Sequence, residues 1–135
     1  MEHSHKILIV DDDPDIRDVL TAVLEAQGYR VVTARDGIDG LATLKAEVPD
    51  VMILDLLMPK MDGYAVCKEL KDPRWSKYAS IPILVLTSVR EDASRRRYEL
   101  ETGLAMDVDD YVEKPISPPV ILDRIKKLLQ KTSAK

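Results

Sequence analysis

The sequence predicts a single α/β domain, a doubly wound (βα)5 fold in which five parallel strands alternate with five helices. Its length, 135 residues, suits one domain. Short apolar runs alternate with longer amphipathic stretches along the whole chain. The first, third and fourth runs are continuously apolar, which is typical of parallel strands covered on both faces. Right-handed crossovers between such strands place helices on both sides of the sheet.

The first half of the chain is expected to hold three strands and two helices. The strands are 7–10, 30–34 and 51–54, each too short and too apolar for a surface helix. A helix over 15–27 ends at a glycine, and a second over 37–47 ends before a proline. Apolar residues expected to face the core at helical spacing are Ile16, Val19, Leu20, Val23, Leu24, Ile38, Leu41, Leu44 and Val48.

The second half continues the alternation. A helix over about 62–71 precedes the strand 83–86, and a weakly patterned helix over 90–103 precedes a short strand at 111–112. A last helix, about 118–131, presents four apolar residues to the core, namely Ile121, Ile125, Leu128 and Leu129.

Composition excludes several classes of protein. With 45% hydrophobic and 33% charged residues the chain is an ordinary globular sequence, and its net charge of -4 argues against a general nucleic-acid binder. The single cysteine, Cys67, excludes an internal disulfide and a multi-cysteine metal site. No apolar run approaches the ~20 residues of a membrane span, and residues 1–6 lack the apolar region of a signal peptide. We therefore expect a cytoplasmic protein with no direct contact to nucleic acid or membrane.

Polar residues follow the predicted strands at their carboxyl ends, where doubly wound folds place their sites. Asp11 and Asp12 end the first strand, Asp55 ends the third, Thr87 ends the fourth and Lys114 ends the fifth. Three gathered carboxylates repel one another unless a cation lies between them. An all-oxygen set suits Mg²⁺, which also accepts phosphate ligands, and a lysine and a hydroxyl suit phosphoryl oxygens.

Each of these residues also has a plainer interpretation. The run Asp11–Asp13 before Pro14 could cap a helix, and Asp55 could form a structural salt bridge. Thr87 alone could be a strand-end hydroxyl and Lys114 alone a surface lysine. Their joint placement at four strand ends favours the functional interpretation.

Three segments carry a family resemblance. They are Ile7–Pro14, Asp55–Gly63 and Asp109–Pro115. Together they resemble the receiver domains of bacterial two-component response regulators, the family of the chemotaxis regulator. The resemblance extends over about residues 5–131 and implies the strand order 2-1-3-4-5.

The resemblance also implies a phosphoacceptor and a metal site. Asp55 would accept the phosphoryl group and bind Mg²⁺, or Mn²⁺ as the alternative ion, together with Asp12. Asp11 would act on the ion directly or through water, and the backbone carbonyl of Leu57 would complete the protein ligands.

The remaining implied roles concern the phosphoryl oxygens and the switch. Thr87 would donate a hydrogen bond to one oxygen and Lys114 would pair with another, placed there by a cis bond to Pro115. Tyr111 would be the switch aromatic. The implied phosphodonor is a sensor histidine kinase or a histidine phosphotransfer protein, and the downstream protein target is not identified.

Two stretches depart from the family pattern. Surplus residues lie around 99–108, and the stretch 72–80, which includes Trp75, is long. Each is either a surface-loop insertion or a docking patch for a specific partner. Arg95–Arg97 is expected to be a solvated face balanced by nearby acids.

Alternative functions are a constitutive interaction module without phosphorylation, a phosphate-ester hydrolase and a flavin-binding protein. The intact acidic set argues against the first. Leu57 stands where the hydrolase would need a second acid, and no phosphate-binding loop follows the first strand. The sequence leaves open whether the chain is a whole protein or part of a longer regulator or hybrid kinase.

Overall fold

A five-stranded parallel sheet forms the centre of the molecule, with the order β2-β1-β3-β4-β5. The structure, a computed structural model, describes residues 4–56, 58, 60–87 and 108–133. The strands are β1 (Lys6–Val10), β2 (Arg30–Ala34), β3 (Val51–Asp55), β4 (Ile83–Thr87) and β5 (Asp110–Glu113). The predicted doubly wound fold and its strand order are confirmed. The predicted helix over 90–103 and the run Arg95–Arg97 lie outside the described residues.

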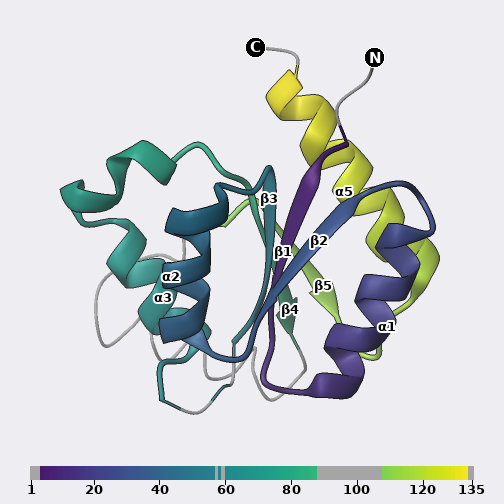
Figure 1. Ribbon diagram of the computed structural model, residues 1–135, viewed down its shortest axis with the longest axis horizontal. Coiled ribbons are helices and arrows are strands. Elements are labelled where there is room, and N and C mark those ends of the chain that lie inside the picture. The colour runs from purple at the N-terminus through teal and green to yellow at the C-terminus, as the bar shows by residue number, and fades with distance from the viewer. Residues whose placement is uncertain (1–3, 57, 59, 88–107, 134–135) are drawn as a thin grey trace.

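Helices cover the sheet on both sides (Figure 1). One face carries α1 (Pro14–Glu25) and α5 (Pro118–Ser133), and the other carries α2 (Gly37–Glu47), α3 (Gly63–Leu70) and a 3-10 helix, η1 (Pro73–Tyr78). No helix in the described part of the chain has the length and apolar character needed to cross a membrane.

The core has two halves because successive side chains of a strand point to opposite faces. Ile7 and Ile9 of β1 pack towards α1 and α5, together with Leu20, Ile121 and Ile125. The alternate residues of the same strand, Leu8 and Val10, pack towards α2, α3 and η1. All five residues of β3 are buried, as a strand in the middle of a covered sheet should be.

Aspartates begin several of these elements. Their side chains accept hydrogen bonds from backbone amides that have no partner within the first helical turn. The capping residues of α1, α2, α3 and η1 are Asp13, Asp36, Asp62 and Asp72. The helix-cap interpretation of the Asp11–Asp13 run is therefore right for its last member.

Three apolar residues expected in the core are exposed instead. Ile38 is 58% exposed because the buried stripe of α2 runs through Gly37, Gly40, Leu41 and Leu44, about one residue out of phase with the predicted one. Val48 is 53% exposed because it caps the end of α2 in a left-handed conformation (φ 44°). Val19 is 50% exposed, next to the buried Leu20.

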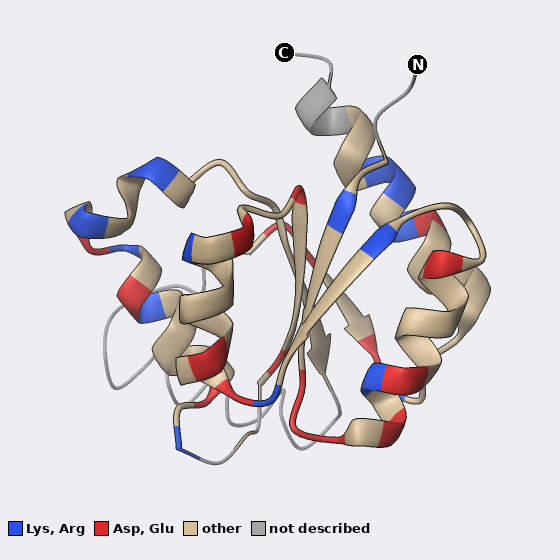
Figure 2. Cartoon of the chain, in the orientation of Figure 1, with Lys and Arg blue, Asp and Glu red and all other residues tan. Residues whose placement is uncertain are grey.

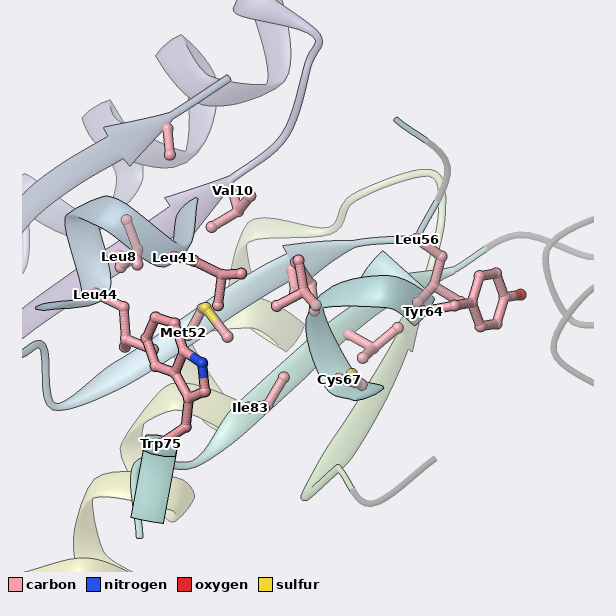
Figure 3. Packing of buried hydrophobic residues seen from close by; sticks show 14 residues of the cluster. Leu8, Val10, Leu41, Leu44, Met52, Leu56, Tyr64, Cys67, Trp75 and Ile83 are labelled. Atoms are coloured by element: carbon pink, nitrogen blue, oxygen red, sulfur yellow. The ribbon is translucent and has the colours of Figure 1, made fainter. Parts of the chain in front are cut away.

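The stretch 72–80 is not a plain surface-loop insertion, and its interpretation as a docking patch stays a prediction. It forms η1, and Trp75 is buried in the core half that α2 and α3 cover. Figure 3 shows the Trp75 ring pointing towards Leu44 and Met52. The Lys45 ammonium lies 4.9 Å from the centroid of the Trp75 ring. The stretch thus contributes an apolar anchor to the core.

Candidate functional site

The predicted site residues lie at the carboxyl edge of the sheet, at the lower end in Figure 1. Asp55 and Thr87 are the last residues of β3 and β4, and Asp11 and Lys114 directly follow β1 and β5. The parallel register pairs Asp55 with Leu86 and Thr87 with Glu113, so these strand ends are level with one another. Figure 2 shows acidic segments gathered at the same edge.

Three carboxylates meet there. One oxygen each from Asp11, Asp12 and Asp55 lies within 4.8 Å of the other two. Asp11 and Asp55 are buried and Asp12 is exposed. Oδ1 of Asp11 accepts a hydrogen bond from the amide of Asp13 at 2.9 Å, whereas its buried Oδ2 has no donor among the described residues. A buried oxygen without a donor, on a carboxylate group that lies beside two others, fits a cation ligand.

Burial governs the titration of this cluster. It raises the pKa of Asp11 to about 6, with a further increase from the charge of Asp55 and an opposing decrease from the Asp13 amide. Burial also raises the pKa of Asp55, while the hydrogen bond and charge of Lys114 act in the opposite direction. Both carboxylates are thus held in an environment that disfavours their ionised form until a cation joins them.

Lys114 reaches the buried acid from the end of β5. Its ammonium donates a hydrogen bond to Oδ1 of Asp55 at 3.0 Å. The backbone holds it there, because the Lys114 amide donates to the Thr87 carbonyl at 2.6 Å. The bond between Lys114 and Pro115 is cis. Lys114 is therefore neither a surface lysine nor distant from the acids.

Thr87 and Tyr111 lie on neighbouring strands at the same side of the site. Thr87 is partly exposed at the end of β4. Tyr111 is half-buried and packs against the core half that contains Val85 and Tyr64. Leu57, whose carbonyl the resemblance adds to the metal ligands, lies outside the described residues.

The loop after β3 depends on two close backbone approaches. Gly63 donates to the Leu56 carbonyl at 2.9 Å, and a Cβ at Gly63 would lie 2.5 Å from the Asp55 carbonyl oxygen. Gly37, at the start of α2, donates to the Met61 carbonyl at 2.9 Å, and a Cβ there would lie 2.3 Å from that oxygen. The loop that follows the acid is thus held against α2.

Two contacts near the site were not predicted from the sequence. The approach of Gly37 to Met61 joins residues far apart in sequence, and the glycine itself was the available signal. The other is Arg17, whose guanidinium donates to the Asp11 carbonyl oxygen at 2.8 Å. An arginine one turn into the helix after an acidic run hints at such a contact, but its target cannot be read from spacing.

Comparisons with known proteins agree with this geometry. The family model of the response regulator receiver domain matches residues 7–126. The chain is 44% identical over 133 residues to "Probable transcriptional regulator ycf27" of Guillardia theta, covering 98% of this chain and 48% of that protein. The chain therefore spans about half the length of such curated relatives.

Solved structures give the same answer. The signal receiver domain of a signal transduction histidine kinase from Syntrophus aciditrophicus is 34% identical with a TM-score of 0.81, covering 95% of this chain and 92% of that one. Chemotaxis protein CheY4 of Vibrio cholerae is 29% identical with a TM-score of 0.79, covering 94% and 100%. The chain belongs to the response regulator receiver domain family.

Proposed function

We propose that this domain is a phosphorylation switch in which Asp55 accepts a phosphoryl group from a phosphohistidine. The donor would be a sensor histidine kinase or a histidine phosphotransfer protein. One observation carries the proposal: Asp55 is a buried carboxylate with an ammonium at 3.0 Å and two further carboxylates within 4.8 Å. This arrangement combines a nucleophile, a fixed positive charge and a set of cation ligands in one place.

The acidic set fits Mg²⁺, with Mn²⁺ as the alternative ion. Asp11, Asp12 and Asp55 would hold it, and the unpartnered Oδ2 of Asp11 supports this assignment. The Leu57 carbonyl, taken from the family resemblance, would add a fourth protein ligand. The bound ion would neutralise charge on the phosphoryl oxygens and orient them.

The protein's own part in the transfer is nucleophilic attack and charge stabilisation. A carboxylate oxygen of Asp55 forms the new bond to phosphorus, and the bond from phosphorus to the donor imidazole nitrogen breaks, with its electron pair leaving on that nitrogen. Lys114 would pair with a phosphoryl oxygen, and the position of its ammonium beside Asp55 supports this role. Thr87, at the end of the adjacent strand, would donate to another oxygen.

The chain would therefore catalyse its own phosphorylation and dephosphorylation and otherwise act as a signalling domain. The output would pass through Thr87, drawn towards the phosphoryl group, and Tyr111, which would move into the space behind it. Thr87 ends β4 and Tyr111 lies in the neighbouring β5, so a protein-binding face that includes β5 would change between two packed states.

The downstream target remains a separate question. Curated relatives are about twice as long as this chain and carry the name of transcriptional regulators, whereas one structural relative is part of a histidine kinase. We infer that this domain itself binds a protein partner and no nucleic acid. The cytoplasm as its place of action is an inference from the sequence.

Labelling with acetyl phosphate tests the proposal. The wild type should gain one phosphoryl group by mass spectrometry when Mg²⁺ is present and none when it is removed by chelation. Asp55→Asn should gain none, and Asp123→Asn, which changes a half-exposed carboxylate on α5, should label like the wild type. Full labelling of Asp55→Asn would refute the assignment. Absence of labelling in the wild type would favour an interaction module without phosphorylation.

A further inference from the structure

The turn between β1 and α1 carries two of the three carboxylates and is built from backbone contacts. The Asp11 amide donates to the Ala34 carbonyl at 3.1 Å, one residue beyond the β1–β2 ladder. Oδ1 of Asp11 accepts from the Asp13 amide at 2.9 Å. These contacts fix the orientation of the Asp11 amide and side chain. Neither of them involves the Asp11 carbonyl group.

Arg17 fixes the orientation of the Asp11 carbonyl group. It lies in the second turn of α1, is half-buried, and its Nη1 donates to the Asp11 carbonyl oxygen at 2.8 Å. This oxygen belongs to the planar peptide group that joins Asp11 to Asp12. Fixing its direction fixes the plane from which the Asp12 side chain leaves the main chain.

The Arg17 guanidinium binds a backbone carbonyl although carboxylates lie nearby. A guanidinium near carboxylates commonly binds them in a bidentate manner, and here that would occupy the oxygens that a cation needs. Within the described part of the chain, Arg17 pairs with no carboxylate and uses only the Asp11 carbonyl. The acidic oxygens of Asp11 and Asp12 are therefore left to face Asp55.

The direction of the Asp12 side chain depends on how the peptide group before it is held. Asp12 is exposed, and its charge acts on both Asp11 and Asp55 in the direction expected of like charges at short range. A free carboxylate in that position would turn towards solvent. The geometry points to Arg17 as a positioning residue for the cation site, one that holds the Asp11–Asp12 peptide so that both carboxylates face Asp55. This inference rests on the proposed function.

The direction in which Mg²⁺ affinity changes when Arg17 is removed distinguishes a positioning role from the effect of a nearby positive charge. If Arg17 acted only as a nearby positive charge, its removal would reduce repulsion of a divalent cation, and Mg²⁺ would bind more tightly. If Arg17 positions the ligands, its removal weakens binding. Loss of a residue that orients metal ligands typically costs 10- to 100-fold in affinity, so we expect about a tenfold loss.

Arg30 offers a matched control. Its guanidinium also binds a backbone carbonyl, that of Ser4, through Nε at 3.2 Å and Nη2 at 3.0 Å. This contact lies at the opposite end of the sheet, where β2 begins. Arg30→Ala therefore removes the same kind of bond and the same charge without touching the acidic turn.

The experiment is titration calorimetry with Mg²⁺ on the wild type, Arg17→Ala, Arg17→Lys and Arg30→Ala at constant ionic strength. Arg17→Ala should raise the dissociation constant about tenfold, and Arg30→Ala should leave it unchanged. In acetyl phosphate labelling, Arg17→Ala should need correspondingly more Mg²⁺ for the half-maximal rate and should reach the wild-type rate at saturation. A general structural defect would lower that saturating rate as well.

Arg17→Lys keeps the positive charge on a shorter side chain. If Arg17→Ala does not fold, this variant tests whether Arg17 positions the ligands. Weakened Mg²⁺ binding by this variant supports positioning, and wild-type affinity overturns it. Unchanged or tighter binding by a folded Arg17→Ala also overturns the inference while the proposed function stands. If the wild type itself binds no Mg²⁺ at millimolar concentration, the proposed cation site fails and this inference fails with it.

Discussion

The ammonium of Lys114 and Oδ1 of Asp55 lie 3.0 Å apart, although 59 residues separate them in sequence. The pair is mostly shielded from water, with the Asp55 side chain 3% exposed and that of Lys114 25% exposed. Lys114 therefore already contacts the proposed phosphoacceptor. Little reorganisation would be needed for its ammonium to contact a phosphoryl oxygen.

Replacing Lys114 by glutamine should slow phosphorylation much more than it changes the fold. Removal of one preorganised donor to a developing negative charge costs roughly 10²- to 10³-fold in rate. The labelling rate with acetyl phosphate and saturating Mg²⁺ measures this. Lys127→Gln, which breaks an exposed pair with Asp123 on α5, serves as the control and should label at the wild-type rate. Equal rates for both variants would contradict the role given to Lys114.

The metal-free domain should become more stable as the pH is lowered from 7 towards 4. The folded-state pKa of Asp11, about 6, lies above its ordinary value of 3.8, so the folded state binds the proton more tightly. Stability from this group is present at low pH and is lost as the pH rises through about 6.

Asp11→Asn isolates this contribution, because asparagine keeps an oxygen for the Asp13 amide and carries no charge. At pH 7 without metal it should be more stable than the wild type by at most about 3 kcal/mol, and the difference should shrink as the pH falls. Urea unfolding at several pH values measures it, with Asp123→Asn as the control. A difference that stays constant with pH would show that ionisation of Asp11 is not its cause.

Gly63→Ala should impair phosphorylation, since its Cβ would lie 2.5 Å from the Asp55 carbonyl and 2.9 Å from the Leu56 Cα. Those are backbone atoms, so the main chain at Asp55 and Leu56 must shift, and overpacking costs about 1–3 kcal/mol of stability. Gly28→Ala is the matched control. Its cost, about 1–2 kcal/mol, arises from φ of 87° in open space far from the site. Labelling rates should separate two variants of similar stability.

Trp75→Ala should lower the free energy of unfolding by about 3–5 kcal/mol, as expected for a large buried aromatic side chain. Trp75 is 8% exposed and lies in the core half with Leu44 and Met52. Trp75→Phe should retain most of the stability. Urea unfolding measures this difference. A loss of unfolding free energy below about 1 kcal/mol would show that the stretch 72–80 is a surface insertion that contributes little to the core.

The first, third and fourth strands were predictable because their apolar runs are continuous and are followed by polar residues. Val51–Asp55 is buried throughout, as expected for a strand of that composition in a sheet covered on both faces. The helix faces were less certain. In α2 the buried stripe includes Gly37, which lies against Met61 and Val66, and Gly40, which lies against Val10 of β1. Residues without side chains give no apolar signal. The predicted stripe therefore shifted to Ile38, which is exposed.

Part of the candidate site followed from topology alone. Because parallel strands end at one edge, Asp11, Asp55 and Lys114 had to lie near one another. What topology could not give is the direction of individual groups. The contact of Arg17 with a backbone carbonyl depends on the turn of the chain after β1. The burial of Trp75 depends on η1, a 3-10 helix for which a stretch of mixed polarity gives no periodic signal.

The edge position of β5 has a consequence for association between copies of the domain. An edge strand can add a strand from another molecule and so begin aggregation. β5 is short, and its charged residues, Asp110 and Glu113, are both acidic and stand at its two ends. In parallel pairing with a second β5 each acid would face its own copy, and in antiparallel pairing Asp110 would face Glu113. Carboxylate would oppose carboxylate in either direction. Because Arg124 of α5 pairs with Asp110 at 2.9 Å, the repulsion is strongest between the two Glu113 side chains in parallel pairing, which the strand therefore discourages.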